Sequence, residues 1–289
     1  MYSNILFPTD GGPGSDRAME CAFELARTFD ATLHTLYDIE RESVPGLEPS
    51  EPHELDDTFD ELGNEITQSV QERAIERGLD IVRQVRDGVA YRSILEYVDE
   101  QDIDLIVLGT RGRSGPRNRH LGSTTQRVIS RTDVPVWTVA LEESTDSTPS
   151  FESVDRILVP TDGSDAAERA AVHACDLASR YDADVRVVYV VDVNTFGFED
   201  AARSVVGLLK QGGENAVETI ADLARERDVP VSTAILRGNP DDAILQYGHG
   251  ADADLIAMGT RGQTADERFL GSTTARVVRR SGIPVLTVQ

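Results

Sequence analysis

The sequence predicts an α/β protein of two Rossmann-like, doubly wound domains, each a parallel sheet with helices on both faces. Short apolar runs alternate with longer segments of helical periodicity, which is typical of parallel strands joined by helical crossovers. The motifs also recur about 150 residues apart: Ile5–Gly11 matches Ile157–Gly163, and Leu105–Gly112 matches Leu255–Gly262. Each half of the 289-residue chain is long enough to bury its own core.

The elements of the first half follow from its periodicity, in chain order. An apolar run stopping at Thr-Asp-Gly is a strand ending in a turn, and Met19, Ala22, Phe23 and Ala26 then recur at helical spacing. After a second strand, an acidic loop with prolines leads into a charged amphipathic helix that stops at Gly78. The fourth strand is apolar throughout, as expected for a strand covered on both faces. We therefore predict strands at 5–8, 32–37, 80–85, 105–108 and 134–139, and helices at 16–29, up to 78, at 93–98 and at 124–129.

The second half repeats this order. Its strands are predicted near 157 and at 185–191, 231–236, 255–258 and 284–288, with helices from 166, up to 227, from 241 and from 274. Residues 142–150 between the halves are polar, carry a proline and lack an apolar period, which is typical of a linker. We predict domains at 1–141 and 154–289, joined by a linker at 142–153.

The composition narrows the classes of partner. The formal net charge is -23, and Lys210 is the only lysine. Such a surface repels nucleic acid and anionic membranes, so we expect neither as a partner. Carboxylates spread along the chain favour adaptation to high salt over an acidic interaction tail. No segment is long and apolar enough for a membrane span, so we expect a cytoplasmic protein, which the carboxylates suggest is halophilic. Cys21 and Cys175 form no disulfide framework or metal motif, so we expect buried thiols.

The residues that could carry chemistry follow the first and fourth strands of each half. Ligands of open parallel sheets bind beyond the carboxyl ends of strands, where the strand order reverses. Asp10 and Asp162 follow the first strand, and a carboxylate there could accept hydrogen bonds from ribose hydroxyls. Asp-Gly after a strand is also ordinary turn chemistry, so these two residues alone are a weak signal.

Glycine loops follow the fourth strand. Gly-Thr-Arg-Gly at 109–112 and 259–262 predicts a sharp backbone turn and an N–H that a phosphate oxygen can approach. Gly-Ser-Thr at 122–124 and 271–273 adds free N–H groups and hydroxyls at a helix start, where the dipole favours an anion. Turns and helix caps alone would also explain such residues. The same order appearing twice favours phosphate binding.

These motifs resemble the universal stress protein family. The family signature is Gly, two residues, Gly, nine residues, then Gly-Ser or Gly-Thr. Gly109, Gly112, Gly122 and Ser123 match it, whereas the second half has eight intervening residues instead of nine. The Pro-Thr-Asp-Gly strand end and the Val-Pro-Val type last strand are also similar to the family, so both halves are covered and the chain resembles a tandem member.

The resemblance implies a sheet of strand order 3-2-1-4-5 in each domain and an ATP, ADP or AMP, commonly with Mg²⁺, across strands one and four. It implies ribose contacts at Asp10 and Asp162, and adenine contacts from the backbone of Leu36 and Val190. The implied phosphate contacts are Gly109, Arg111, Gly112, Gly122, Ser123 and Thr124 in the first half, and Gly259, Arg261, Gly262, Gly271, Ser272 and Thr273 in the second. The last strands, Val136–Val139 and Val285–Val288, would join the halves as an internal pseudo-dimer, and a homodimer stays open.

The two predicted sites differ in charge. The first loop carries Arg111, Arg113, Arg117 and Arg119 without a carboxylate, whereas in the second Asp266 and Glu267 offset its arginines. The arginines could instead pair with carboxylates nearby. We predict that the first site holds a triphosphate more tightly.

The motifs favour a non-enzymatic stress-response sensor whose nucleotide occupancy orders loops and biases association with partners. Lys210 lies outside any glycine pattern, which excludes a P-loop ATPase, and the five histidines show no ligand spacing. No catalytic residue is predicted. A weak ATPase or adenylyl-transferring enzyme and a scaffold that binds no nucleotide are the two alternatives.

Overall fold

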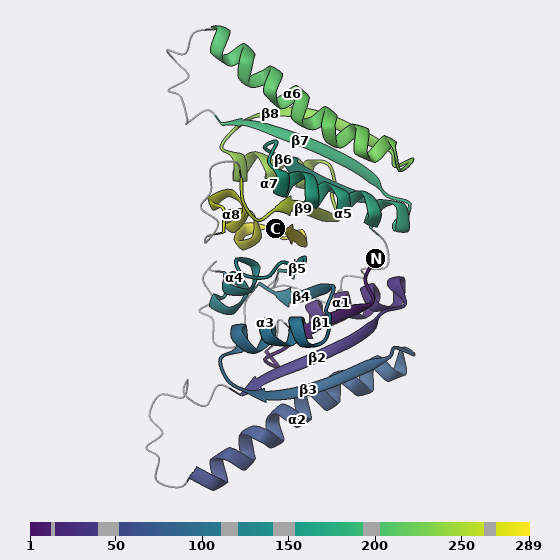
Figure 1. Cartoon of the computed structure of the whole chain (residues 1–289), viewed down its shortest axis with the longest axis vertical. Coiled ribbons are helices and arrows are strands. Elements are labelled where there is room, and N and C mark those ends of the chain that lie inside the picture. The colour runs from purple at the N-terminus through teal and green to yellow at the C-terminus, as the bar shows by residue number, and fades with distance from the viewer. Residues whose placement is uncertain (13–14, 40–51, 111–120, 141–153, 193–202, 263–269) are drawn as a thin grey trace. The chain divides into compact units, whose positions relative to one another are not determined.

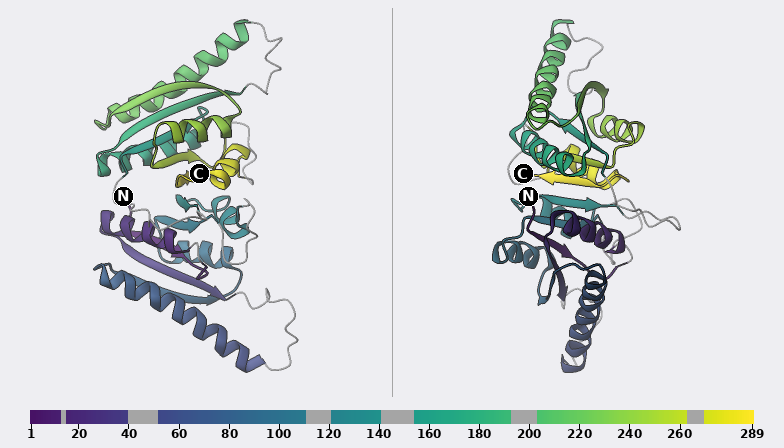
Figure 2. Two further views of the ribbon diagram at one scale, coloured as in Figure 1. Left: turned by 180° about the vertical axis from the view of Figure 1, so that it is seen from behind. Right: turned by 90° about the vertical axis from the view of Figure 1, so that its right-hand side faces the viewer.

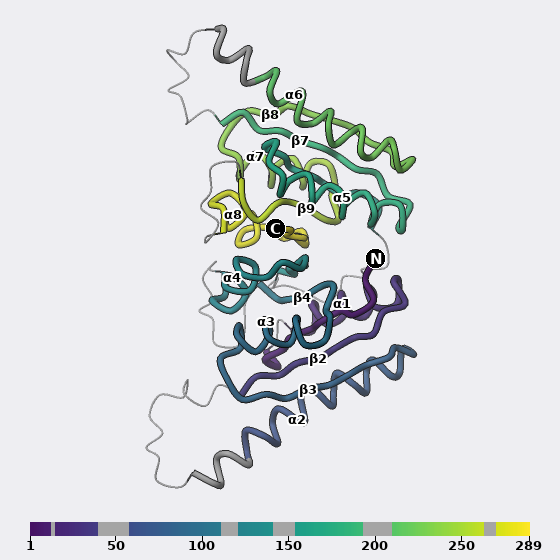
Figure 3. Tube along the Cα trace, in the orientation of Figure 1, coloured from purple at the N-terminus to yellow at the C-terminus, as the bar shows by residue number. Residues whose placement is uncertain are grey.

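The computed structural model describes residues 1–12, 15–39, 52–110, 121–140, 154–192, 203–262 and 270–289 (Figures 1 and 3), without the side chains of 52–57 and 203–209. The chain divides into two compact units, residues 1–151 (unit 1) and 152–289 (unit 2). The predicted linker lies outside the described residues. Each unit is described by itself, so the predicted junction between their last strands stays a prediction.

In its described residues, unit 1 is a five-stranded parallel sheet with four helices. Its strands lie in the order β3-β2-β1-β4-β5, and each neighbouring pair is parallel. The elements are β1 (Asn4–Pro8), α1 (Ser15–Phe29), β2 (Thr32–Ile39), α2 (Pro52–Glu76), β3 (Ile81–Asp87), α3 (Ala90–Glu100), β4 (Leu105–Gly109), α4 (Ser123–Ile129) and β5 (Val136–Val139). This is the strand order that the resemblance implies.

Unit 2 repeats the architecture with the strand order β8-β7-β6-β9-β10. Its elements are β6 (Arg156–Thr161), α5 (Asp165–Tyr181), β7 (Asp184–Asp192), α6 (Arg203–Arg225), β8 (Val231–Gly238), α7 (Pro240–Gly250), β9 (Leu255–Gly259), α8 (Ser272–Arg280) and β10 (Val285–Val288). The predicted fold class, two doubly wound α/β domains, is confirmed.

Helices cover both faces of each sheet. In unit 1, α1 and α2 lie on one face and α3 and α4 on the other, as right-handed crossovers require when the strand order reverses at β1 (Figures 1 and 2). The central strands β1 and β4 are almost wholly buried, which explains their uninterrupted apolar sequences. Among the described residues, no helix is long and apolar enough to cross a bilayer.

Most predicted elements differ from the observed ones only at their ends. The second strand, for example, continues past its predicted end at residue 37 to Ile39, because Asp38 and Ile39 still pair with β3. The local sequence there is charged, which predicts a loop. The hydrogen bonds of a neighbouring strand, which periodicity does not report, extend the strand.

Candidate functional site

Both predicted site segments of each unit lie where the strand order reverses. In unit 1, β1 lies between β2 and β4, and the crossovers that leave β1 and β4 go to opposite faces. The turns after these two strands therefore lie at the carboxyl edge of the sheet, at the switch point where open parallel sheets bind ligands. The turns after β6 and β9 do so in unit 2.

The two predicted ribose contacts hold the turn after the first strand of each unit. Asp10 Oδ1 accepts hydrogen bonds from the Gly12 N–H (2.9 Å) and the Ser15 hydroxyl (3.3 Å). Asp162 Oδ1 accepts one from the Ser164 N–H (3.1 Å). One oxygen of each carboxylate is thus used in turn chemistry, the alternative role that the sequence left open.

The glycine loop and the helix after it are joined by the same two hydrogen bonds in both units. In unit 2, the Gly271 N–H donates to Thr260 O (2.8 Å), and Thr274 Oγ1 donates to Gly259 O (2.8 Å). In unit 1, the Gly122 N–H donates to Thr110 O and Thr125 Oγ1 donates to Gly109 O, both at 2.9 Å. These bonds hold the end of the fourth strand of each unit against the start of the following helix.

This arrangement corrects one prediction and adds a residue type. Gly122 and Gly271 were expected to offer free N–H groups, but both N–H groups are bonded to the preceding loop. Thr125 and Thr274 were missed as site residues. The signal was present, because Gly-Ser-Thr-Thr occurs in both halves and helix capping does not require the last threonine.

The N–H groups that remain belong to the first turn of α4 and α8. Ser123 and Ser272 are the first residues of these helices, and Thr124 and Thr273 the second. Gly122 and Gly271 are the N-cap residues and have no side chain to accept from the first turn. First-turn N–H groups have no acceptor within their own helix, so these positions offer backbone donors at the carboxyl edge of the sheet.

Gly259 permits close packing rather than an unusual turn. A Cβ at Gly259 would lie 2.8 Å from the carbonyl carbon of Ala166 and 2.9 Å from the N of Ala167. The absent side chain therefore lets the start of α5 pack against the end of β9. Gly259 is not among the described residues of positive φ, and the predicted sharp turn follows it directly, as bends at Thr260 and Arg261.

Gly262 and Arg261 bring the second glycine loop against the β6–α5 turn. A Cβ at Gly262 would overlap Asp162 Oδ2, so any other residue there would have to displace that carboxylate. The Ser164 hydroxyl donates to Arg261 O at 3.4 Å. Burial first, and then the charge of Asp162, raise the pKa of Tyr189. The structure thus gathers Asp162, the glycine loop and the end of β7 at one edge.

The predicted base contacts do not occupy equivalent positions. The Leu36 carbonyl accepts the Thr9 N–H at 2.9 Å, so it belongs to the sheet, and the register makes Val188 its counterpart in unit 2. Val190 lies two residues further on, beyond the last paired residue of β6, while still pairing with β8. Alternate strand residues face the same neighbour, so the backbone of Val190 faces the β6 side of β7, beyond the end of β6. Its counterpart in unit 1 is Asp38, and the prediction for Leu36 is revised accordingly.

Arg111 and Gly112 lie outside the described residues, as do Arg113, Arg117 and Arg119. The predicted difference in triphosphate affinity therefore stays a prediction. Among the described residues, no group of three or more His, Cys, Asp or Glu side chains has a metal-binding arrangement.

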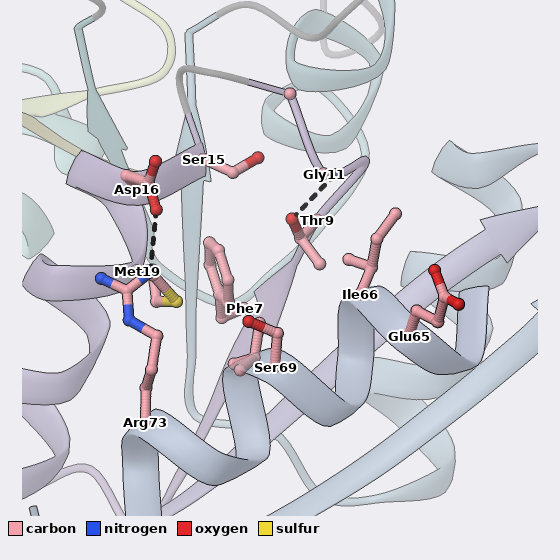
Figure 4. Close-up of a pocket in the computed structure, with 12 residues that line it drawn as sticks. Phe7, Thr9, Gly11, Ser15, Asp16, Met19, Glu65, Ile66, Ser69 and Arg73 are labelled. Carbon is pink, nitrogen blue, oxygen red and sulfur yellow. Dashed lines mark hydrogen bonds and ion pairs between the residues drawn. The ribbon is translucent and has the colours of Figure 1, made fainter. Parts of the chain in front are cut away.

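A cavity of about 310 Å³ lies beside the β1–α1 turn of unit 1, against α2 (Figure 4). Ile66 of α2 packs under Gly11, whose φ of 68° is left-handed. Arg73 donates to Asp16 (2.9 Å) and Glu20 (2.8 Å) of α1 at the cavity's other end. This cavity contains no residue of the glycine loops. Its arginine is already paired with carboxylates of α1, so the lining does not indicate one class of ligand.

Comparison with known proteins agrees with this geometry. The sequence profile of the universal stress protein family matches residues 1–140 and again 153–289. A universal stress protein of Methanocaldococcus jannaschii is 40% identical over 138 residues, which cover 46% of this chain and 81% of that protein. A crystal structure of a universal stress protein from Archaeoglobus fulgidus covers 99% of this chain and 96% of its own, with a TM-score of 0.75 and 22% identity.

A shorter universal stress protein, crystallised in complex with cAMP, matches 47% of this chain at 24% identity with a TM-score of 0.37. Two matches to one family profile, in the two halves that the structure separates, account for nearly the whole chain. The chain belongs to the universal stress protein family, with one family domain in each half.

Proposed function

We propose that each unit binds ATP at its glycine loop and serves as a non-enzymatic sensor of nucleotide. This proposal rests on the two hydrogen bonds that join the end of the strand to the helix start in each unit. They are donated by Gly271 and Thr274 in unit 2 and by Gly122 and Thr125 in unit 1. They hold the N–H groups of a helix start at the carboxyl edge of the sheet. Backbone donors at such an edge suit the oxygens of a polyphosphate.

The rest of the nucleotide would follow the edge of the sheet. Asp162 lies between the glycine loop and Tyr189 at the end of β7, where a ribose would stand between the phosphates and the base. The backbone of Val190, and that of Asp38 in unit 1, would meet the adenine. Mg²⁺ would be held chiefly by phosphate oxygens and water, because the described residues contain no ready-made carboxylate cluster.

The test removes one N–H from each site without changing the helix. Ser123 and Ser272 are first helical residues, the position that tolerates proline best, so Ser123→Pro and Ser272→Pro each delete one donor. Ser123→Ala and Ser272→Ala keep the N–H and lose the hydroxyl, which makes them matched controls. Isothermal titration with Mg·ATP should show two sites in the wild type. Each proline variant should weaken one site by about tenfold or more, since a hydrogen bond to a charged group contributes roughly 1.5–3 kcal/mol.

Proline variants that bind Mg·ATP with the wild-type affinities would refute the proposed site. The same titrations compare the two units. Ser272→Pro leaves unit 1 intact and Ser123→Pro leaves unit 2 intact, so tighter residual binding in the first variant is expected. Equal residual affinities would end the idea that unit 1 binds ATP more tightly.

The enzyme alternative predicts a different signal. An ATPase or adenylyl-transferring protein would release phosphate or AMP over many turnovers, and the release would fall in the proline variants. For a sensor we expect bound ATP to be recovered intact by mass spectrometry after the titration.

A further inference from the structure

The two units differ in a cluster between their third and fourth helices. In unit 1, Tyr91 of α3 is surrounded by three arginines, which we call the arginine cluster: Arg92, Arg127 and Arg131. The guanidinium carbons of Arg127, Arg131 and Arg92 lie 5.0, 5.3 and 5.8 Å from the centre of the Tyr91 ring. Arg92 Nε also donates to the Tyr91 hydroxyl oxygen at 3.0 Å. All three arginines are exposed to solvent.

Unit 2 has carboxylates at the matching places. Asp241 is the second residue of α7, as Tyr91 is of α3, and Arg276 and Arg280 occupy the α8 positions that Arg127 and Arg131 occupy relative to α4. The Asp241 side chain, 3% exposed, accepts hydrogen bonds from Arg276 (3.3 Å) and Arg280 (2.5 Å). Arg280 also pairs with Asp242 at 2.6 Å. In this unit the arginines bind anions that the chain itself supplies.

Unit 1 keeps the arginines but has no carboxylate at the places of Asp241 and Asp242. The hydrogen bond to Tyr91, and then nearby negative charge that includes Glu96 one turn along α3, raise the pKa of Arg92. Tyr91 stands where unit 2 has Asp241, and Arg92 stands where it has Asp242. In the part of the chain that the structure describes, no carboxylate lies within 4.0 Å of the guanidinium nitrogens of the cluster. The first turn of α3 has no acidic residue either, whereas that of α7 has two. The hydrogen bond from Arg92, and then the charges of the arginines, lower the pKa of the half-buried Tyr91.

We propose that the arginine cluster is a docking site for an acidic segment of a partner protein, whose carboxylates take the place that Asp241 holds in unit 2. Three guanidinium groups around one ring provide forked donors for carboxylates. Arginine and tyrosine are enriched at protein interfaces, and Val89, 40% exposed, adds an apolar contact beside them. In a chain of net charge -23, a cationic surface of this kind is a local exception that selects acidic partners.

The test converts the cluster into its unit 2 counterpart. Fluorescein-labelled hexaglutamate is titrated with the full chain in saturating Mg·ATP, which occupies the proposed nucleotide sites, and anisotropy is measured. We expect binding by the wild type, and about tenfold weaker binding by the double variant Tyr91→Asp, Arg92→Asp, whose carboxylates neutralise Arg127 and Arg131. Labelled hexaglutamine should not bind. Unchanged fluorescence of Trp137, the single tryptophan and a residue of unit 1, checks the fold.

Two further variants keep the test decisive. Arg127→Gln with Arg131→Gln alters only exposed side chains and should also weaken binding, whereas Arg276→Gln with Arg280→Gln in unit 2 should leave it unchanged. The proposal is overturned if the wild type does not bind hexaglutamate, or if the unit 1 variants bind it as the wild type does. It is equally overturned if inorganic phosphate at the concentration of the peptide displaces it, or if a single-stranded oligothymidylate binds the cluster more tightly.

Discussion

Acidification should destabilise unit 1 through one buried histidine. His34 of β2 is 5% exposed, and its Nδ1 lies 3.0 Å from the hydroxyl of Tyr97 on α3. Its Nε2 is buried without a hydrogen-bond partner among the described residues. Burial lowers the pKa of His34 from its ordinary 6.5. The folded state therefore holds a neutral imidazole and resists protonation.

The sign follows from proton linkage. Below pH 6.5 the unfolded chain binds a proton at His34 and the folded chain does not. The free energy of unfolding therefore decreases as the pH is lowered. The contribution is complete above pH 6.5 and is lost as the pH falls toward the folded-state pKa. Within that window the loss is at most about 1.4 kcal/mol for each pH unit.

The assay uses the fluorescence of Trp137, which is 1% exposed and lies in β5 of unit 1, so it reports urea unfolding of that unit. The matched variant is His34→Asn, whose amide does not titrate and can still hydrogen-bond Tyr97. Between pH 7.5 and pH 5.5, the unfolding free energy of the wild type should decrease more than that of the variant. His173, whose pKa burial also lowers, is present in both the wild type and the variant, so its contribution cancels in the difference. A difference that stays constant across that pH range would refute the reasoning.

Three further predictions concern packing and reactivity. Thr274→Val leaves Gly259 O without the donor at 2.8 Å, so it should cost about 1 kcal/mol of stability and weaken Mg·ATP binding in calorimetry, while Thr274→Ser should restore both. Gly259→Ala places a methyl 2.8 Å from the Ala166 backbone, so it should destabilise unit 2 by about 1–3 kcal/mol and lower its thermal midpoint; an unchanged calorimetric midpoint would contradict the packing argument. Burial raises the pKa of Cys21, and that of Cys175 to about 11, so both buried thiols should react with a disulfide reagent only after unfolding in urea, and fast reaction in buffer would count against this.

Some residues of the proposed site are predicted by the sequence because their chemistry is local. The glycine loops, Asp10 and Asp162 are recognised by residue type, by their order along the chain and by their repetition in the second half. Leu36 was placed two residues out of register, because an unpaired strand does not show which of its carbonyls a neighbour uses. Thr125 was missed because its partner, Gly109 O, is sixteen residues away and reached only after the loop closes.

The sequence by itself determined the α/β class, the duplication and the family, since each depends on periodicity and on motifs that are local in the chain. Tertiary structure decided which backbone donors remain at the carboxyl edge of the sheet, which glycines serve close packing and which unit neutralises its own arginines. The last distinction rests on single exchanges such as Tyr91 for Asp241. The effect of such an exchange depends on the fold, because a neighbouring helix places two guanidinium groups beside Tyr91 in unit 1 and beside Asp241 in unit 2. The energy of a charge depends on its neighbours in space.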